Sequence, residues 1–314
     1  MNQSIISELT KQFNVYKNDQ SLKWKARALS GAIQKIKKLP FEIVHPKEQL
    51  SQVKGFGKGI ITRIEKILEN GSLSQIQPDE TSAIMEQLCS ITGVGPTRAK
   101  KWLKGGIKTI NDVKDAIKAG KIKSTHHIDI GLRYYDDFLV RIPRKEIQRM
   151  EKILRRTLHY MNPKCILTIC GSYRRGCKDS GDIDMIITHP DISENIQKEK
   201  FLSTFVKALK GINFIIDDLT KLGEKKYMGV CKTGKISRRI DIRCFNYPEY
   251  YAAMLYFTGS KNFNLQMRNK AIEKGFSLNE YGLKKDKKLI MLKSEQECFD
   301  FLDMEYSNPE ERNI

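Results

Sequence analysis

Two aspartates separated by one residue end a glycine- and arginine-rich segment in the middle of the sequence. The segment Gly171–Asp184 reads Gly-Ser-Tyr-Arg-Arg-Gly-Cys-Lys-Asp-Ser-Gly-Asp-Ile-Asp and lies between apolar runs at 165–170 and 185–188. This pattern predicts a strand, a turn and a second strand that carries Asp182 and Asp184. Side chains at positions i and i+2 of a strand point from the same face. Two carboxylates so placed repel unless a cation lies between them, and oxygen ligands of this kind suit Mg²⁺.

The first half of the same segment contains the residue types that bind phosphate. Gly171 and Ser172 would present backbone N–H groups and a hydroxyl at a strand end, and a pair of arginines that includes Arg175 follows. Ser180 and Gly181 add a second small turn beside the carboxylates. A phosphate-binding turn next to a metal-binding carboxylate pair predicts nucleotidyl transfer. The alternative is a solvated hairpin that carries Asp-Ile-Asp by chance.

A third aspartate is expected to join this pair. Asp241 lies in the segment 238–245, where its two isoleucine neighbours would point to the opposite face of a strand. Because a carboxylate buried alone in a strand is costly, we expect Asp241 to meet the other two aspartates across a sheet. Two metal ions about 3.5 to 4 Å apart could then bridge the carboxylates and clamp the oxygens of an in-line displacement. The alternative is an edge-strand aspartate paired with Arg239 or Arg243.

The composition favours a polyanionic partner. The chain has 314 residues, with 56 Lys and Arg against 37 Asp and Glu and a formal net charge of +19. This length suits about two domains, and the basic balance favours nucleic acid over an anionic membrane surface. The sequence lacks a membrane-length apolar run and a signal-peptide pattern, so we expect a soluble, intracellular protein. The sequence does not distinguish a nuclear protein from a viral or cytoplasmic one. Its 7 cysteines form no Cys-x-x-Cys pair and fit a reducing compartment.

A repeated glycine pattern stands out in residues 1 to about 140, which are predicted to be almost entirely helical. Gly55-Phe-Gly57 and Gly93-Val-Gly95 each lie between two short predicted helices. The glycines permit a tight turn and leave the first N–H groups of the following helix open to a phosphate. One such turn would more simply be a helix C-cap. Two copies in a chain this basic predict binding to the DNA backbone.

Together these motifs resemble the family X DNA polymerases, most closely the beta and lambda types. The resemblance covers nearly the whole chain and rests on the two glycine turns, which resemble helix-hairpin-helix elements, and on the segments 171–176, 181–184, 188–190, 238–243 and 255–260. It implies an α+β fold with an all-helical N-terminal part that contains two helix-hairpin-helix motifs, a nucleotidyltransferase-type palm with a mixed β-sheet, and a small α/β C-terminal subdomain.

The resemblance also implies four domains. They are a lyase-type domain that binds the 5′-phosphate of a gap, a helical DNA-binding subdomain with the second hairpin, the catalytic palm, and a C-terminal subdomain for nucleotide selection, at residues 1–78, 79–142, 143–248 and 249–314.

Roles follow from the resemblance residue by residue. Asp182, Asp184 and Asp241 would be the catalytic residues and would bind two Mg²⁺ ions, with Mn²⁺ as a substitute. The residues implied to bind the incoming nucleotide are Arg141, Gly171, Ser172, Arg175, Ser180, Gly181, Tyr256, Phe257, Gly259 and Asn264. The residues implied to contact DNA are Trp24, Lys25, Gly55, Gly57, Lys58, Gly93, Gly95, Arg239 and Arg268. Na⁺ or K⁺ would bind at the two hairpins, between protein and phosphate.

One departure from the family concerns its lyase activity. In relatives with this activity, a lysine on the second helix of the first hairpin forms a Schiff base with a 5′-deoxyribose phosphate. The corresponding residue here is Arg63, and a guanidinium stays protonated and cannot act as an amine nucleophile. We therefore expect lyase activity to be lost or moved to Lys58 or Lys66, while Trp24 and Lys25 still bind the 5′-phosphate.

The expected function is gap filling in base excision repair. The short turn at 232–235 and the pair Tyr256-Phe257 favour a template-directed, dNTP-selective family member. The implied partners are gapped or primer-template DNA, dNTPs and repair proteins such as a DNA ligase, with no membrane and a monomeric chain. Two alternatives remain. A nucleotidyltransferase acting on RNA or a small molecule would not need the hairpins, and a catalytically weak DNA-binding repair scaffold would not need all three carboxylates.

Overall fold

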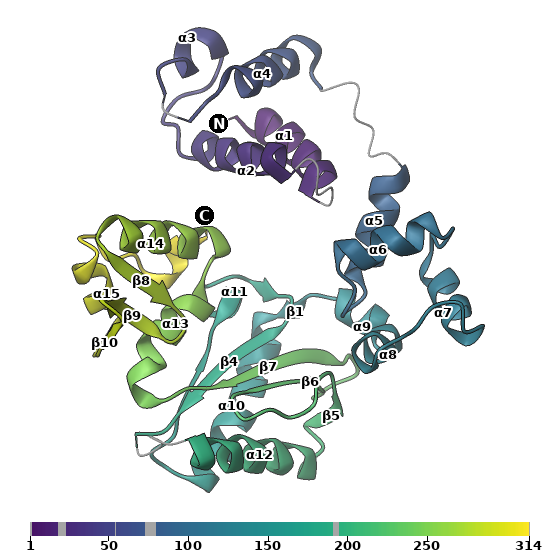
Figure 1. Cartoon of the computed structure of the whole chain (residues 1–314), viewed down its shortest axis with the longest axis vertical. Coiled ribbons are helices and arrows are strands. Elements are labelled where there is room, and N and C mark those ends of the chain that lie inside the picture. The colour runs from purple at the N-terminus through teal and green to yellow at the C-terminus, as the bar shows by residue number, and fades with distance from the viewer. Residues whose placement is uncertain (1, 18–22, 54, 73–79, 191–194, 314) are drawn as a thin grey trace. The chain divides into compact units, whose positions relative to one another are not determined.

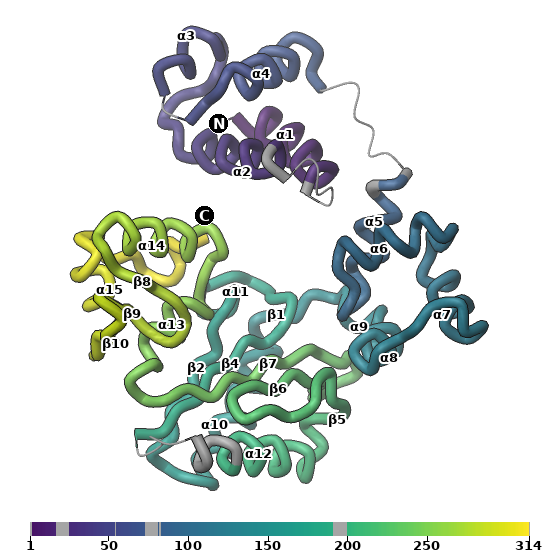
Figure 2. The backbone as a smooth tube through the Cα atoms, viewed as in Figure 1, coloured from purple at the N-terminus to yellow at the C-terminus, as the bar shows by residue number. Residues whose placement is uncertain are grey.

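Two compact units make up the chain, Met1–Ser124 and Thr125–Ile314 (Figure 1). This computed structural model describes residues 2–17, 23–53, 55–72, 80–190 and 195–313 (Figure 2). Within these ranges, no helix is both long and apolar enough to cross a membrane. The first unit is helical and the second combines helices with a mixed sheet, which confirms the α+β class predicted from the sequence.

The first unit is built from helices α1 to α7. Their bounds are Gln3–Lys17, Lys23–Lys37, Pro46–Leu50, Lys58–Asn70, Glu80–Ser90, Pro96–Lys104 and Ile110–Lys118. Apolar residues three or four positions apart form the buried face of each helix, as a helix period of 3.6 requires. Leu9 of α1, Leu29 of α2 and Ile64 of α4 are fully buried in one shared core with Leu50 at the end of α3.

The second unit begins with α8 (His126–Arg133), α9 (Tyr135–Leu139), β1 (Ile142–Pro143) and α10 (Arg144–Met161). Its main sheet has five strands in the order β2-β4-β7-β6-β5. Their bounds, in that order, are Ile166–Ile169, Ile183–Thr188, Arg238–Cys244, Lys226–Cys231 and Ile215–Asp218. Strands β4 and β7 are parallel, whereas the other neighbours are antiparallel.

Helices α10 and α12 (Asn195–Gly211) contribute to the core beneath this sheet. Met150 of α10 and Phe205 of α12 are buried with Ile183, Ile240 and Ile242 from the sheet. Burial alternates along β7, so its isoleucines enter the core while the residues between them face the other side. The opposite face carries Asp184 of β4 and Asp241 of β7, beside an apolar cluster that includes Ile186.

A smaller C-terminal part completes the second unit. It consists of a short 3₁₀ turn (Tyr247–Glu249), α13 (Tyr250–Thr258), α14 (Lys261–Glu273), β8 (Phe276–Asn279), β9 (Gly282–Lys285), β10 (Lys288–Ile290), α15 (Glu295–Phe301) and a last 3₁₀ turn (Pro309–Arg312). Strands β8, β9 and β10 form an antiparallel sheet. Gly259, with a φ of +67°, separates α13 from α14.

The segment that precedes the aspartate pair differs from the expected strand, turn and strand. It forms a four-residue helix, α11 (Gly171–Arg174), and a short strand, β3 (Asp179–Ser180), that pairs with β1. Asp182 lies just before β4 rather than on it, so only Asp184 is a strand residue. Gly171 has a φ of +57°, and a Cβ there would lie 2.5 Å from Oδ2 of Asp184. The turn can therefore pass closely over the carboxylate only because residue 171 is glycine.

Candidate functional site

Aspartates from two neighbouring parallel strands lie close together. Asp184 on β4 is in register with Asp241 on β7, and Asp182 lies two residues before Asp184. The expectation that Asp241 meets the other pair across the sheet is therefore correct at the level of strand register. Strand β7 is central in the sheet, so the edge-strand alternative is wrong.

Arginines on β7 contact two of the three carboxylates. Arg239 Nη2 donates to Asp182 Oδ2 at 2.8 Å, and Arg243 Nε donates to Asp241 Oδ1 at 3.1 Å. In the described parts of the chain, no three acidic, histidine or cysteine side chains are gathered closely enough to hold a metal ion as they stand. The arginine pairing that the sequence left open is thus present, and a cation bound at these carboxylates would compete with it.

The electrostatics of the site favour a bound cation. Burial, followed by the nearby charges of Asp182 and Asp241, holds the pKa of Asp184 well above its ordinary value. Burial also raises the pKa of Asp241, against the opposing effect of Arg243. Carboxylates that are half-buried and mutually repelling are relieved by a hard divalent cation. The donor set therefore fits Mg²⁺ or Mn²⁺.

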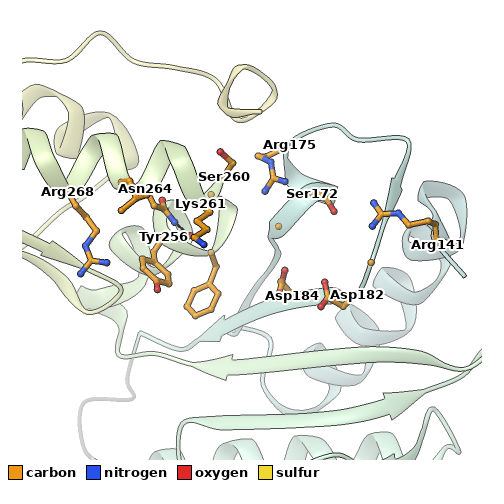
Figure 3. A pocket seen from close by; sticks show the side chains of 15 residues that line it. Arg141, Ser172, Arg175, Asp182, Asp184, Tyr256, Ser260, Lys261, Asn264 and Arg268 are labelled. Carbon is orange, nitrogen blue, oxygen red and sulfur yellow. Dashed lines mark hydrogen bonds between the residues drawn. The ribbon is translucent and has the colours of Figure 1, made fainter. Parts of the chain in front are cut away.

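A cavity of about 630 Å³ lies beside Asp182 and Asp184 (Figure 3). One side is formed by the segment around α11 and by Arg141, and the other by the end of α13 and the start of α14. All of the predicted nucleotide-binding residues line it except Ser180, which is buried and accepts a hydrogen bond from Ser172 Oγ at 2.8 Å. Asp241 does not line the cavity, whereas Arg268, predicted to contact DNA, does.

Three lining residues were not among the predicted site residues: Ser260, Lys261 and Leu265. The available signal for two of them was their spacing within α14, where Lys261 lies three positions before Asn264 and four before Leu265. Residues so spaced share a helix face. Ser260 also accepts a hydrogen bond from the N–H of Phe263 and so caps α14. Lys261 adds a cation to the cavity wall in Figure 3.

Backbone contacts hold the cavity's polar side chains in place. Arg175 Nη1 donates to the carbonyl of Thr258 at 2.6 Å, which ties the α11 segment to the end of α13. Asn264 Nδ2 donates to the carbonyl of Tyr256 at 2.6 Å. Arg141 Nε donates to Asp179 Oδ1 at 2.8 Å but remains more than half exposed. The cavity thus places several cations around two carboxylates, which suits a polyphosphate bound together with divalent metal ions.

A buried ion cluster joins the two sides of the cavity. Glu295 on α15 accepts from Arg174 Nη2 at 2.6 Å and from Arg312 Nη1 at 2.8 Å, and its side chain is only 4% exposed. Arg174 also donates to Thr258 Oγ1 at 2.8 Å. Arg312 is fully buried. Glu295 is therefore the counter-charge for two arginines that have little access to water.

We expect Glu295→Ala to lower the free energy of unfolding of the second unit by about 3–5 kcal/mol, because it leaves buried cations uncompensated. Urea denaturation followed by circular dichroism measures this. Glu305→Ala is a matched control, since Glu305 is exposed on the same C-terminal part. Equal urea midpoints for the two variants would show that Glu295 does not make the predicted contribution to the free energy of unfolding.

The two predicted hairpins are present in the first unit and share their turn geometry. Gly55 and Gly93 have φ values of +103° and +90°. Gly57 and Gly95 are the N-cap residues of α4 and α6, with extended backbone and no side-chain cap. The first N–H groups of both helices therefore receive no hydrogen bond from an N-cap side chain.

The predicted lyase residues all lie on α4. Arg63 is folded back on its own helix, where Nη1 donates to the carbonyl of Gly59 at 2.6 Å. Lys58 and Lys66 are exposed. Lys25 Nζ lies 5.9 Å from the ring centroid of Tyr16, and the side chain of Trp24 lies outside the described residues. The lyase expectation stays a prediction.

Comparison with protein families assigns most of the chain. Residues 1–73 match the helix-hairpin-helix domain and residues 86–139 the fingers domain of DNA polymerase lambda. Residues 141–247 match the DNA polymerase beta palm and residues 253–313 the DNA polymerase beta thumb.

Individual relatives are about one-third identical to the chain over the aligned residues. It is 32% identical over 325 residues to DNA polymerase lambda of Rattus norvegicus, covering 97% of this chain and 54% of the relative. It is 32% identical over 342 residues to DNA polymerase lambda of Arabidopsis thaliana, covering 100% of this chain and 62% of the relative. It is 29% identical over 313 residues to DNA nucleotidylexotransferase of Gallus gallus, with coverages of 88% and 61%. The chain thus spans little more than half the length of these relatives.

Proposed function

Since the chain belongs to family X of the DNA polymerases, we propose that it is a template-directed DNA polymerase that fills short gaps during DNA repair. The observation that carries the proposal is the cavity, in which Asp182 and Asp184 face a Gly-Ser turn and an aromatic wall. A carboxylate pair, a phosphate-binding turn and a wall for a nucleotide are the parts that nucleotidyl transfer requires.

We assign the binding of two divalent metal ions to Asp182, Asp184 and Asp241. When bound, Mg²⁺ would neutralise charge on the triphosphate and acidify the primer 3′-hydroxyl. In the reaction, this hydroxyl loses its proton, its oxygen bonds to the α-phosphorus of a dNTP, and pyrophosphate leaves. We assign Asp241 a part in activating this hydroxyl, through the metal ion that it would hold.

The remaining cavity residues would bind and orient the nucleotide. Ser172 and the N–H groups of α11 would contact the triphosphate, together with Arg175 and Arg141. Arg239, which now contacts Asp182, would turn to a DNA phosphate once the carboxylate is engaged elsewhere. Arg268 at the rim would contact the template strand. Of these residues, all but Arg239 line the cavity.

Each predicted domain is assigned one part of this function. We assign gap 5′-phosphate binding to residues 1–78, DNA-backbone binding to 79–142, chemistry to 143–248 and nucleotide selection to 249–314. DNA is the partner that the hairpins and the net charge of +19 support. Monomeric action and cooperation with repair proteins such as a DNA ligase remain predictions.

Sugar selection is assigned to Tyr256 with Phe257 and Gly259. The hydrogen bond from Asn264 to the carbonyl of Tyr256 holds this backbone against the cavity. We expect Tyr256→Ala to raise the efficiency of CTP insertion relative to dCTP by at least about tenfold, because a small side chain no longer excludes a 2′-hydroxyl.

Single-nucleotide insertion opposite guanine measures this ratio. Tyr160→Ala is the control, since Tyr160 is 81% exposed and lies outside the cavity. An unchanged ratio in Tyr256→Ala would remove this residue from sugar selection.

Extension of a primer across a one-nucleotide gap in the presence of Mg²⁺ tests the function as a whole. We expect addition of the dNTP complementary to the template. Nucleotide addition that does not depend on the template base would instead favour the reaction for which the DNA nucleotidylexotransferase relative is named. No addition in either Mg²⁺ or Mn²⁺ would leave the scaffold or an RNA or small-molecule transferase as the function.

A further inference from the structure

The first glycine of the first hairpin is covered by a lysine from another helix. Lys35 extends from α2 to the turn, where a Cβ added to Gly55 would overlap its Nζ and lie 2.8 Å from its Cε. The ammonium group therefore lies directly against the backbone of Gly55. Because Gly55 has a φ of +103°, both the turn and this close approach depend on glycine.

The corresponding glycine of the second hairpin also meets a basic side chain. Arg98, in the first turn of α6, folds back so that its Nη1 donates to the carbonyl of Gly93 at 3.2 Å. Gly93 occupies the same place in its Gly-x-Gly turn as Gly55 does in the first, and its φ is +90°. Lys35 precedes its turn in the chain and Arg98 follows it. Side chains from different positions in the chain thus place a positive charge at equivalent glycines.

These side chains do not fit the Na⁺ or K⁺ that the family resemblance implies at the hairpins. At the second turn, the guanidinium that donates to the Gly93 carbonyl already places a positive charge beside the oxygens that a metal ion would need. At Gly55 the space beside the turn contains the Lys35 ammonium. A second unit charge about 4 Å away would be repelled by roughly 1 to 4 kcal/mol, depending on solvent exposure.

We propose that Lys35 and Arg98 replace the monovalent metal ions at the two hairpins and supply the positive charge between each turn and a DNA phosphate. The inference rests on the proposed DNA binding. The first N–H groups of α4 and α6 would contact other oxygens of the same phosphates, since neither helix has a side-chain cap. Affinity for DNA then does not depend on which monovalent cation is in solution.

The test compares two salts with the full chain and a fluorescent duplex that contains a one-nucleotide gap. Anisotropy gives the Kd in KCl and in tetramethylammonium chloride at equal concentration, because the larger ion cannot enter a carbonyl site. We expect the two Kd values of the unchanged protein to agree within about twofold. Lys35→Met and Arg98→Met should each weaken binding by about tenfold in tetramethylammonium chloride and recover in part in KCl.

Matched controls separate this role from simple loss of charge. Lys37→Met and Lys100→Met remove an exposed lysine from the same two helices and should change affinity equally in both salts. Diffraction from crystals grown with Tl⁺ provides a direct readout, and no anomalous peak is expected at either turn of the DNA complex.

Three results would overturn the proposal. The first is a Kd of the unchanged protein that rises more than about tenfold without K⁺. The second is a Tl⁺ peak at either turn. The third is that Lys35→Met and Arg98→Met each have the same Kd in the two salts. Absence of DNA binding in both salts would instead contradict the proposed function.

Discussion

Asp184→Asn is expected to reduce templated dNTP addition by at least about 10³-fold while raising the melting temperature of the metal-free protein. The substitution keeps the shape of the side chain but removes a charge that metal binding needs. Burial and the charges of Asp182 and Asp241 hold the pKa of Asp184 above its ordinary value. The folded state thus prefers this group neutral, and its charged form opposes folding.

The direction of the stability change follows from proton linkage. Between the ordinary pKa of an aspartate and the raised folded pKa, the folded state binds more protons than the unfolded state, so stability falls as the pH rises. Near pH 8 the carboxylate is ionised in both states and the full penalty is present. Asparagine is neutral at every pH, so the variant lacks the penalty.

Two measurements on the same samples test this prediction. Single-turnover gap filling in Mg²⁺ gives the rate, and scanning calorimetry in a chelator gives the melting temperature. Glu224→Gln is the control, since Glu224 is an exposed carboxylate of the same unit outside the cavity. A melting temperature that falls together with activity would attribute the loss to misfolding, and retained activity would exclude Asp184 from the metal site.

Arg63→Lys is expected to create Schiff-base formation at residue 63, where the unchanged protein has no amine nucleophile. A lysine of ordinary pKa has a neutral fraction about 10³-fold larger than an arginine at the same pH, so trapping should rise at least about 100-fold. In the unchanged protein the Arg63 guanidinium also donates to the Gly59 carbonyl, which orients it along α4. Gap 5′-phosphate binding should persist in both proteins.

Borohydride reduction on an incised abasic duplex measures the trapped complex. If the unchanged protein is trapped, loss of trapping in Lys58→Ala or Lys66→Ala would assign the nucleophile to that exposed lysine. Strong trapping that Arg63→Ala abolishes would contradict the prediction. Lys47→Ala, in the neighbouring helix α3, is the control for a general loss of charge.

Local patterns in the sequence were sufficient for much of the fold. Helical periodicity, the repeated Gly-x-Gly turns and the alternation around Asp241 depend on residues within about one turn or a few strand positions of each other. The structure confirms the helical first unit, both hairpins and the placement of Asp241 beside Asp184. The spacing of apolar residues did not predict α11 or β3, because a four-residue helix and a two-residue strand are too short to produce a periodic signal.

By itself, then, the sequence determined the α+β class, most of the residues that line the cavity and the family, because period and motif are local properties of the chain. Only the tertiary structure decided which charges meet. Arg239 could have turned to any nearby anion but contacts Asp182, while Glu295 joins Arg174 to Arg312 across more than a hundred positions. Lys35 reaches Gly55 from another helix. Such pairings depend on packing between distant segments, which no short-range pattern records.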